Sequence, residues 1–240
     1  MSLLTEQIIT SLQDKAIAEK TAFLSGFFKS GPGEYGEGDQ FLEVTVPDQR
    51  KVAKACFKEI SLEEVFQLLQ NPFHEVRLTA LMLLVYRYQK LKSDSDRGEI
   101  VNFYLLHLDF VNNWDFVDCS CHHIIGNYYW QKDKSLFYGL ADSGQLWRQR
   151  VAMISSYFWI KKGEFGDALD LAENLKNHPH DLIHKAVGWM LREIGNKDFN
   201  AEYEFLRKQY QSMPRTALRY AIEKFPEELR QDFLKGKVLE

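Results

Sequence analysis

The chain of 240 residues contains little cysteine, little proline and no long hydrophobic run. Its three cysteines are too few for a disulfide framework and fit a reducing compartment. The longest apolar stretch, around residues 81–86, is far shorter than the roughly 18 residues that a membrane-spanning helix needs. The N-terminal residues lack a basic start and a continuous apolar segment, so no secretory signal is predicted. We therefore expect a cytoplasmic protein.

The spacing of apolar residues predicts an all-α protein. The six prolines leave long uninterrupted stretches between them, and the alternation typical of strands is nearly absent. Apolar residues instead recur at helical spacing, as at Leu78, Leu81, Met82 and Val85. An aromatic content of 14% and a hydrophobic content of 45% supply enough material for a large core.

Helix starts can also be read from the sequence. Ser61 and Glu64 have the spacing of a capping box, in which each side chain binds the backbone N–H of the other residue. Pro72, Pro214 and Pro226 stand where a first helical turn tolerates a missing N–H. These signals predict helices that begin near residues 62, 73, 215 and 227.

A weak internal repeat aligns a basic residue near the start of successive apolar helices. Arg77, Arg150, Lys185 and then Arg215 or Arg219 are separated by 73, 35 and 30 or 34 residues. The first interval is about twice the second, so a further unit is expected near residues 112–118. Such spacing is typical of HEAT-like repeats, whose helix pairs bury their apolar faces against one another. We predict one HEAT-like repeat domain over residues 1–240, a curved α-solenoid, with an irregular helical bundle as the alternative.

The segment Ser30–Asp39 is glycine-rich and predicts a loop. It does not continue into the Gly-Lys-Ser/Thr ending of a phosphate-binding loop, and Glu34, Glu37 and Asp39 would repel a phosphate. We expect its glycines to let the chain turn between two helices, with Tyr35 and Phe41 packed on the helical array.

The net charge of −4 is unevenly distributed. Residues 1–120 carry 12 Lys and Arg against 18 Asp and Glu, whereas residues 121–240 carry 18 against 16. A basic surface for a polyanion is therefore expected in the second half of the chain, although charge alone leaves open a surface without such a partner.

Four residues could act on one ligand. Trp114 and Asp118 are four residues apart, so on a helix they share one face. Arg150 and Trp189 lie on the corresponding helices of the next repeats and could face the same groove. Two indoles and a carboxylate suit a developing cation, and an arginine suits a phosphate. Core packing of the tryptophans and a structural ion pair of the arginine are the alternatives.

A metal site is not predicted. Cys119, Cys121, His122 and His123 lie close in sequence, but on a helix only Cys119 and His123 share a face, and no CxxC or HExxH pattern supplies further ligands. The sequence around His74 does not match a zinc-protease helix either. Buried thiols and hydrogen-bonded histidines are expected instead.

Several segments in a fixed order resemble the AlkD-like DNA alkylation repair family, HEAT-like repeat DNA glycosylases, over nearly the whole chain. They are FFKSGPGEYGEGDQFLEVTVPDQR, HEVRLTALMLLV, NNWDFVD, LWRQRVAM, DLIHKAVGWMLREIG and MPRTALRYAIEKF. The resemblance implies hydrolytic excision of N3- or N7-alkylated purines from duplex DNA that is bound in a concave groove. The chain departs from the family pattern at Glu43, where the family is expected to have a glycine, and at Thr45, where it is expected to have a longer polar residue.

The resemblance also implies roles for individual residues. Trp114, Asp118, Arg150 and Trp189 match the active-site residues of that family. Asp118 would stabilise positive charge on the sugar and orient a water, the tryptophans would pack on the deoxyribose, and Arg150 would hold a phosphate. The basic residues expected to contact DNA are Arg148, Arg150, Lys161, Lys162, Lys185, Arg215 and Arg219.

A cationic alkylated base is a good leaving group, so neither a general acid nor a cofactor is expected. With no lysine among the four residues, we predict a monofunctional glycosylase of base excision repair. A shallow groove without a pocket is expected, so selectivity would come from the charge of the lesion. The partner would be double-stranded DNA containing an alkylated purine, without a membrane or an obligate protein partner. The alternative is a HEAT-like scaffold that binds DNA or protein without chemistry.

Overall fold

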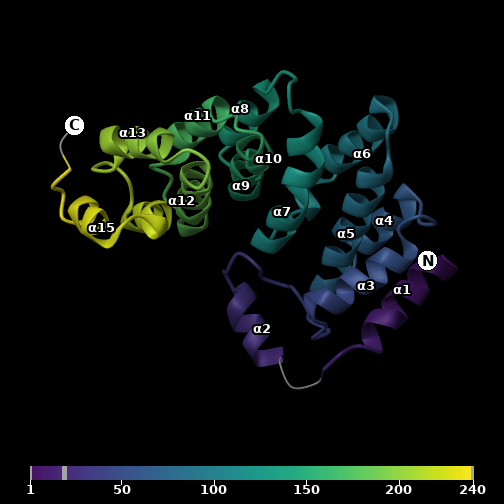
Figure 1. Ribbon diagram of the computed structural model, residues 1–240. Helices are drawn as coiled ribbons and strands as arrows, with labels where there is room; N and C mark the ends of the chain where they lie inside the picture. Colours follow the sequence, from purple (N-terminus) through teal and green to yellow (C-terminus); the bar gives the residue numbers. More distant parts are fainter. Residues whose placement is uncertain (1, 18–20, 239–240) are drawn as a thin grey trace. The chain divides into compact units, whose positions relative to one another are not determined.

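The computed structural model describes residues 2–17 and 21–238, and its regular structure is helical (Figure 1). Within these ranges no β-strand forms, and an isolated parallel bridge joins Gln40 and Phe73. The predicted all-α class is therefore confirmed. The chain divides into two compact units, Met1–Ser120 and Cys121–Glu240. The single domain and its curved, concave form stay predictions.

The first unit is built around helix α5. Its helices are α1 (Leu3–Gln13), α2 (Thr21–Phe28), α3 (Val46–Cys56), α4 (Leu62–Leu69), α5 (His74–Lys90), α6 (Asp94–Leu106), the 3₁₀ turn η1 (Leu108–Phe110) and the start of α7 (Trp114–Cys121). Helix α5 packs against α1, α3, α4 and α6 (Figure 1). Its first twelve residues are all buried, polar as well as apolar, so neighbouring segments surround this part of the helix on every side.

The hydrogen bonds and prolines at the helix starts agree with the starts predicted from the sequence. The Ser61 hydroxyl accepts the N–H of Glu64 at 3.2 Å, and the Glu64 carboxylate accepts the N–H of Ser61 at 2.8 Å. The predicted capping box is therefore confirmed. Pro214 and Pro226 directly precede the first residues of their helices, and Pro72 lies two residues before α5.

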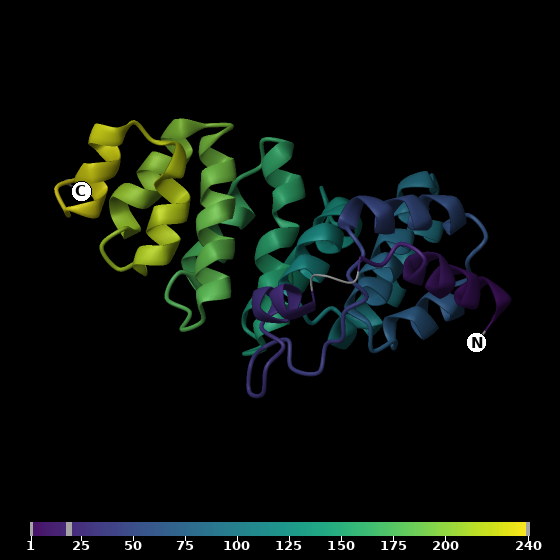
Figure 2. The ribbon, with the colours of Figure 1, turned by 90° about the horizontal axis from the view of Figure 1, so that it is seen from below.

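The second unit is a stack of helices around α12. It contains the π-helical turn η2 (His122–Gly126), α8 (Ser135–Ala141), α9 (Leu146–Ser155), α10 (Tyr157–Lys161), α11 (Gly166–Leu175), α12 (Asp181–Gly195), α13 (Phe199–Gln209), α14 (Arg215–Ala221), the 3₁₀ turn η3 (Ile222–Lys224) and α15 (Glu227–Leu234). Helix α12 packs against α9, α11, α13 and α14, and Figure 2 shows successive helices of this unit, green to yellow, lying side by side.

One glycine makes the contact between α12 and α14 possible. A Cβ atom at Gly188 would lie 2.3 Å from the carbonyl oxygen of Ala217. Since real Cβ atoms do not approach an oxygen this closely, any side chain at this position would push the two helices apart. The adjacent Trp189 is therefore held on a helix whose packing depends on the glycine before it.

The basic residues of the weak repeat take similar places in their helices. Arg150, Lys185 and Arg219 are each the fifth residue of α9, α12 and α14, and Arg77 is the fourth of α5. The unit expected near residues 112–118 corresponds to α7, whose fifth residue is Asp118. A carboxylate therefore occupies the helix position at which the other units carry a cation.

Candidate active site

Helix α7 presents Trp114 and Asp118 on one side. The side-chain oxygen of Asn113 accepts the N–H of Trp114, the first residue of α7, at 2.8 Å. Trp114 and Asp118, one helical turn apart, both line the same cavity. The sequence prediction that this pair shares a face is confirmed by that placement.

The cavity lies within the first unit and has a volume of about 500 Å³. Its walls come from α2, from the chain that leads into α3 and the start of α3, from the first half of α5 and from α7. The expectation of a surface without a pocket is wrong for this unit, because α2 and the chain that leads into α3 supply walls opposite α5 and α7. The volume is in the range usual for small-molecule pockets.

Aromatic rings form one wall of the cavity. The rings of Phe28 and Trp114 stack, with centroids 5.5 Å apart and planes at 16°. Phe27 meets Trp114 edge to face at 5.5 Å, and its side chain is half exposed. Ring faces beside a carboxylate favour a cationic or electron-poor ligand over an anion.

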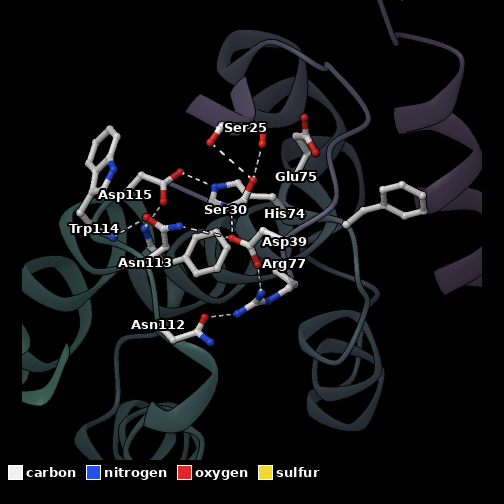
Figure 3. A network of polar contacts seen from close by, with 12 residues as sticks. Ser25, Ser30, Asp39, His74, Glu75, Arg77, Asn112, Asn113, Trp114 and Asp115 are labelled. Atoms are coloured by element: carbon white, nitrogen blue, oxygen red, sulfur yellow. Dashed lines mark hydrogen bonds and ion pairs between the residues drawn. The ribbon is translucent and has the colours of Figure 1, made fainter. Parts of the chain in front are cut away.

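The buried His74 joins the first turn of α7 to the glycine-rich loop (Figure 3). Its Nε2 lies 2.8 Å from a carboxylate oxygen of Asp115, and its Nδ1 lies 2.9 Å from Asp39. The imidazole is packed between aromatic rings, with the centroids of Phe28 and Phe116 at 4.3 and 4.4 Å. Asp115 and Asp118 both line the cavity, and Asp115, next to Trp114, is held by His74.

Arg77 extends this network. Its guanidinium donates to Asp39 at 2.7 Å and to the side-chain oxygen of Asn112 (Figure 3). It also donates to the carbonyl oxygen of Phe110 at 3.2 Å. We call Asp39, His74, Arg77 and Asp115 the His74 network. The network joins the glycine-rich loop, α5 and the segment that leads into α7, so it fixes the place of Trp114 and Asp118.

The charges of the network stabilise one another. Burial alone lowers the pKa of His74, but hydrogen bonds to Asp115 and Asp39 and their negative charges outweigh it and raise the pKa to about 9. Burial alone raises the pKa of Asp39, and the hydrogen bond and charge of His74 together with Arg77 bring it below its usual value. At neutral pH His74 is therefore an imidazolium ion that donates from both nitrogens to two carboxylates.

The glycine-rich loop turns as the sequence predicts. Gly33 and Gly38 have φ angles of 77° and 90°, and a Cβ atom at Gly36 would lie 2.4 Å from the carbonyl oxygen of Phe28. Phe41 stacks on Phe28 at 5.5 Å, so the expectation that it packs on the helices is confirmed. Tyr35 is half-buried.

The two positions that depart from the family pattern lie at the cavity. Glu43 is buried and has a φ of 69°, a conformation that glycine adopts readily and other residues rarely. Thr45 caps α3 by accepting the N–H of Asp48 at 3.4 Å. Both residues line the cavity together with Trp114 and Asp118.

Arg150 and Trp189 lie in the second unit. Arg150 is buried on α9 and donates to the carbonyl oxygen of Leu182 at 2.5 Å. The half-buried Trp189 donates from its indole N–H to Glu193 at 3.0 Å and lies 5.6 Å from the ring of Tyr157. The expectation that these two residues face the groove of Trp114 and Asp118 stays a prediction.

The basic residues expected to contact DNA all belong to the second unit. Lys161, Lys162, Arg215 and Arg219 are exposed, whereas Arg148 and Lys185 are half-buried and Arg150 is buried. Lys185 pairs with Asp181 at 2.7 Å, and Arg215 donates to the carbonyl oxygen of Leu234 at 2.8 Å. Their DNA contacts stay predictions.

The two cysteines at the end of α7 and the two histidines that follow are not placed to hold a metal ion together. Cys121 is buried and Cys119 half-buried, and the rings of His122 and His123 lie 3.9 Å apart. Within residues 2–17 and 21–238, no group of three or more His, Cys, Asp or Glu side chains is placed to hold a metal ion.

In the same ranges, no helix has the length and apolarity needed to cross a membrane.

The sequence did not predict the His74 network or the contacts of Trp114 with the rings of Phe27 and Phe28. From the sequence, His74 stands out only as part of a possible zinc-protease pattern, and Arg77 only as a repeat residue. The aspartate that binds both of them, Asp39, is 35 and 38 positions away in sequence, so no local spacing signals the contact. The signal available in the sequence is a histidine and an arginine three residues apart, just before an apolar stretch of a predicted helix.

The helical fold and the site define an all-α protein with an aromatic, acidic cavity in its first unit. The family model described as DNA alkylation repair enzyme matches residues 8–225, and the chain belongs to this family. A solved structure described as a predicted DNA alkylation repair enzyme from Enterococcus faecalis has the same fold, with a TM-score of 0.69. The two are 17% identical over 89% of this chain and 98% of the other. No curated protein matches the sequence.

Proposed function

We propose that the protein is a DNA glycosylase that hydrolyses the N-glycosidic bond of N3- or N7-alkylated purines in duplex DNA. The observation that carries the proposal is the shared cavity of Asp118 and Trp114, in a chain of the DNA alkylation repair family. The carboxylate stands beside ring faces in a mostly apolar space, and such surroundings strengthen its attraction for a cation.

The chemistry follows from the charge of the lesion. An N3- or N7-alkylpurine already carries a positive charge, so the base leaves with the electrons of the C1′–N bond and needs no proton from the protein. The sugar then becomes cationic, and the Asp118 carboxylate would stabilise that charge by on the order of several kcal/mol. Water adds to C1′, and Asp118 would orient it and accept its proton.

The remaining residues have roles in binding. Trp114 and Trp189 would pack against the deoxyribose and exclude water, and Arg150 would hold a phosphate beside the lesion. Arg148, Lys161, Lys162, Lys185, Arg215 and Arg219 would bind further phosphates.

The proposed enzyme is monofunctional. A lyase step requires an amine that forms a Schiff base with the sugar, and no lysine is found among the described residues that line the cavity. Borohydride should therefore trap no covalent complex with the DNA.

The test is single-turnover release of 7-methylguanine from a defined duplex by the wild type and by Asp118→Asn. We expect release by the wild type and a fall of about 100-fold or more in the variant, because the amide keeps the size of the side chain and loses its charge. Asp96→Asn, an exposed carboxylate on α6, is the matched control and should leave the rate unchanged.

The outcomes separate the glycosylase from its alternative. Equal rates for the wild type and Asp118→Asn would remove Asp118 from the mechanism. Retained duplex binding without release of 7-methylguanine or 3-methyladenine by the wild type would mean a HEAT-like scaffold that binds DNA without chemistry. Rapid excision of uncharged hypoxanthine or uracil would contradict selection by the charge of the lesion.

A further inference from the structure

The cavity of the first unit has a buried apolar floor. Val44, Leu78 and Met82 line it and are 5%, 3% and 4% exposed. A ligand reaches these side chains only by entering the cavity. Its volume of about 500 Å³ is in the range of pockets that enclose drug-sized ligands, and a methylated purine base is smaller than such a ligand.

The side of the cavity that faces solvent is also partly apolar. Phe27, near the end of α2, and Val46, the first residue of α3, both line the cavity and are 50% and 42% exposed. Large apolar side chains that are exposed beside an opening are typical of a surface that a ligand covers. The cavity therefore has an open rim and a closed floor, so a flat ligand could be enclosed in it.

Charge decides which part of a nucleotide could enter. Asp115 and Asp118 line the cavity, and their carboxylates disfavour a phosphate group there. The stacked rings of Phe28 and Trp114 form a wall that suits a flat heterocycle. Arg50, which also belongs to the lining, is exposed and suits the phosphate of the same nucleotide. A nucleotide would therefore enter with its base first.

We propose that this cavity receives the whole purine base after the nucleotide has turned out of the duplex. The inference rests on the proposed function and names the part of the substrate that the cavity binds. A base stacked in a duplex exposes only its edges in the grooves, so it cannot reach the floor at Val44 and Leu78. Inside the cavity, the base and its C1′ atom share one enclosure with Asp118, and the released base is a product that the cavity still binds.

The first measurement is binding of free 3-methyladenine to the whole protein by isothermal titration calorimetry. The free base has neither sugar nor phosphate, so its binding depends on the cavity and on no contact with the DNA backbone. We expect saturable binding at one site in the wild type. Val44→Phe should raise the Kd about tenfold or more, because the larger side chain fills the floor.

A matched control separates filling of the cavity from crowding of the core. Val52 of α3 is also 5% exposed and is not among the described residues that line the cavity. Val52→Phe therefore adds the same bulk to a buried site of the same unit and leaves the cavity open. It should bind 3-methyladenine with a Kd within about twofold of the wild type.

The second measurement is single-turnover release of 7-methylguanine from a duplex. Val44→Phe should slow the release about tenfold or more and leave the Kd for the duplex within about twofold, because it removes space for the base and no phosphate contact. Val46→Trp narrows the exposed rim without crowding the core, so it should have the same effect and decides the test if Val44→Phe does not fold. Val52→Phe should release the base at the wild-type rate.

Each result decides the inference. A wild type that shows no saturable binding of 3-methyladenine up to its solubility limit would overturn it, as would an equal Kd in Val44→Phe. Release of 7-methylguanine at the wild-type rate by the cavity-filling variants would also overturn it, and the glycosylase proposal would stand with a base that reacts outside the cavity. If the wild type binds 3-methyladenine and Val44→Phe does not, but no base is released from DNA, the glycosylase proposal fails and the purine site stands.

Discussion

Glu202 shows that a single buried carboxyl can cost stability in this protein. It lies on α13 and is 2% exposed. It packs closely on Gly195 of α12, where a Cβ atom would lie 1.7 Å from its Oε2. Burial raises the pKa of Glu202 to about 9, and the opposing charge of Arg192 lowers it only in part. At neutral pH the folded chain therefore holds this carboxyl protonated.

The prediction for this residue concerns stability against pH. The unfolded chain releases the Glu202 proton above the ordinary value of 4.5 and the folded chain only near 9, so stability falls as the pH rises between these values. Glu202→Gln removes the titration and keeps the shape. It should raise the free energy of unfolding by about 1–3 kcal/mol near neutral pH, and much less near pH 4, in urea unfolding experiments. Equal stability of both proteins at neutral pH would contradict the assignment.

At the scale of elements, the His74 network holds the first turn of α7 against α5 and the glycine-rich loop. Asp115, in the first turn of α7, and Asp39, in the glycine-rich loop, bind the two nitrogens of one imidazole that projects from α5. Three segments distant in sequence thus share one buried set of charges. The place of Trp114 and Asp118 at the cavity depends on contacts made by their neighbours, and a change at His74 should affect both stability and activity.

The prediction for the network is a loss of stability in alkali. The pKa of His74 rises from 6.5 to about 9 on folding, so its contribution is complete below pH 6.5 and is lost as the pH rises towards 9. Since the pKa of Asp39 is lowered, its contribution is complete above 3.8 and is lost in acid. His74→Gln should lower the free energy of unfolding by about 2 kcal/mol near pH 6 and by much less above pH 9.

A control in the same unit makes this test specific. His107 is half-buried and contacts the rings of Phe66 and Phe103. His107→Gln should leave the difference between pH 6 and pH 9 as in the wild type. If His74→Gln kept the alkaline loss of the wild type, the titration would belong to another group.

For the whole molecule, the two compact units differ in net charge. Residues 1–120 carry 12 basic and 18 acidic side chains, a net charge of −6, and residues 121–240 carry 18 and 16, a net charge of +2. The boundary between the compact units lies between residues 120 and 121. The acidic cavity and the exposed Lys161 and Lys162 thus belong to different units of one chain, which suits separate recognition of a cationic base and of phosphates.

The prediction at this scale concerns salt. The logarithm of the DNA dissociation constant should depend linearly on the logarithm of salt concentration. Replacing Lys161 and Lys162 together by alanine should lower the slope by about 1–2. Each lost contact between a lysine and a phosphate means that binding releases about one counterion fewer from the DNA. The matched control replaces Lys51 and Lys54 of α3 in the first unit, which should leave the slope unchanged. A larger effect from the control would place the phosphate contacts in the first unit.

What the sequence by itself determined depends on neighbours within about one helical turn. The helical class, the capping box of Ser61 and Glu64, and the shared face of Trp114 and Asp118 follow from spacings of three or four residues, and the structure agrees with each. Such features are readable because the backbone alone brings these residues together.

Only the tertiary structure decided the cavity, the His74 network and the conformation of Glu43. Asp39 and Asp115 lie 35 and 41 residues from His74 in sequence, and the N–H groups bound by Glu75 lie 32 and 33 residues before it. No local spacing brings such groups within hydrogen-bonding distance. They meet because the apolar middle of α5 is buried by the segments around it, and the polar groups of those segments then satisfy the buried polar side chains of its first turn.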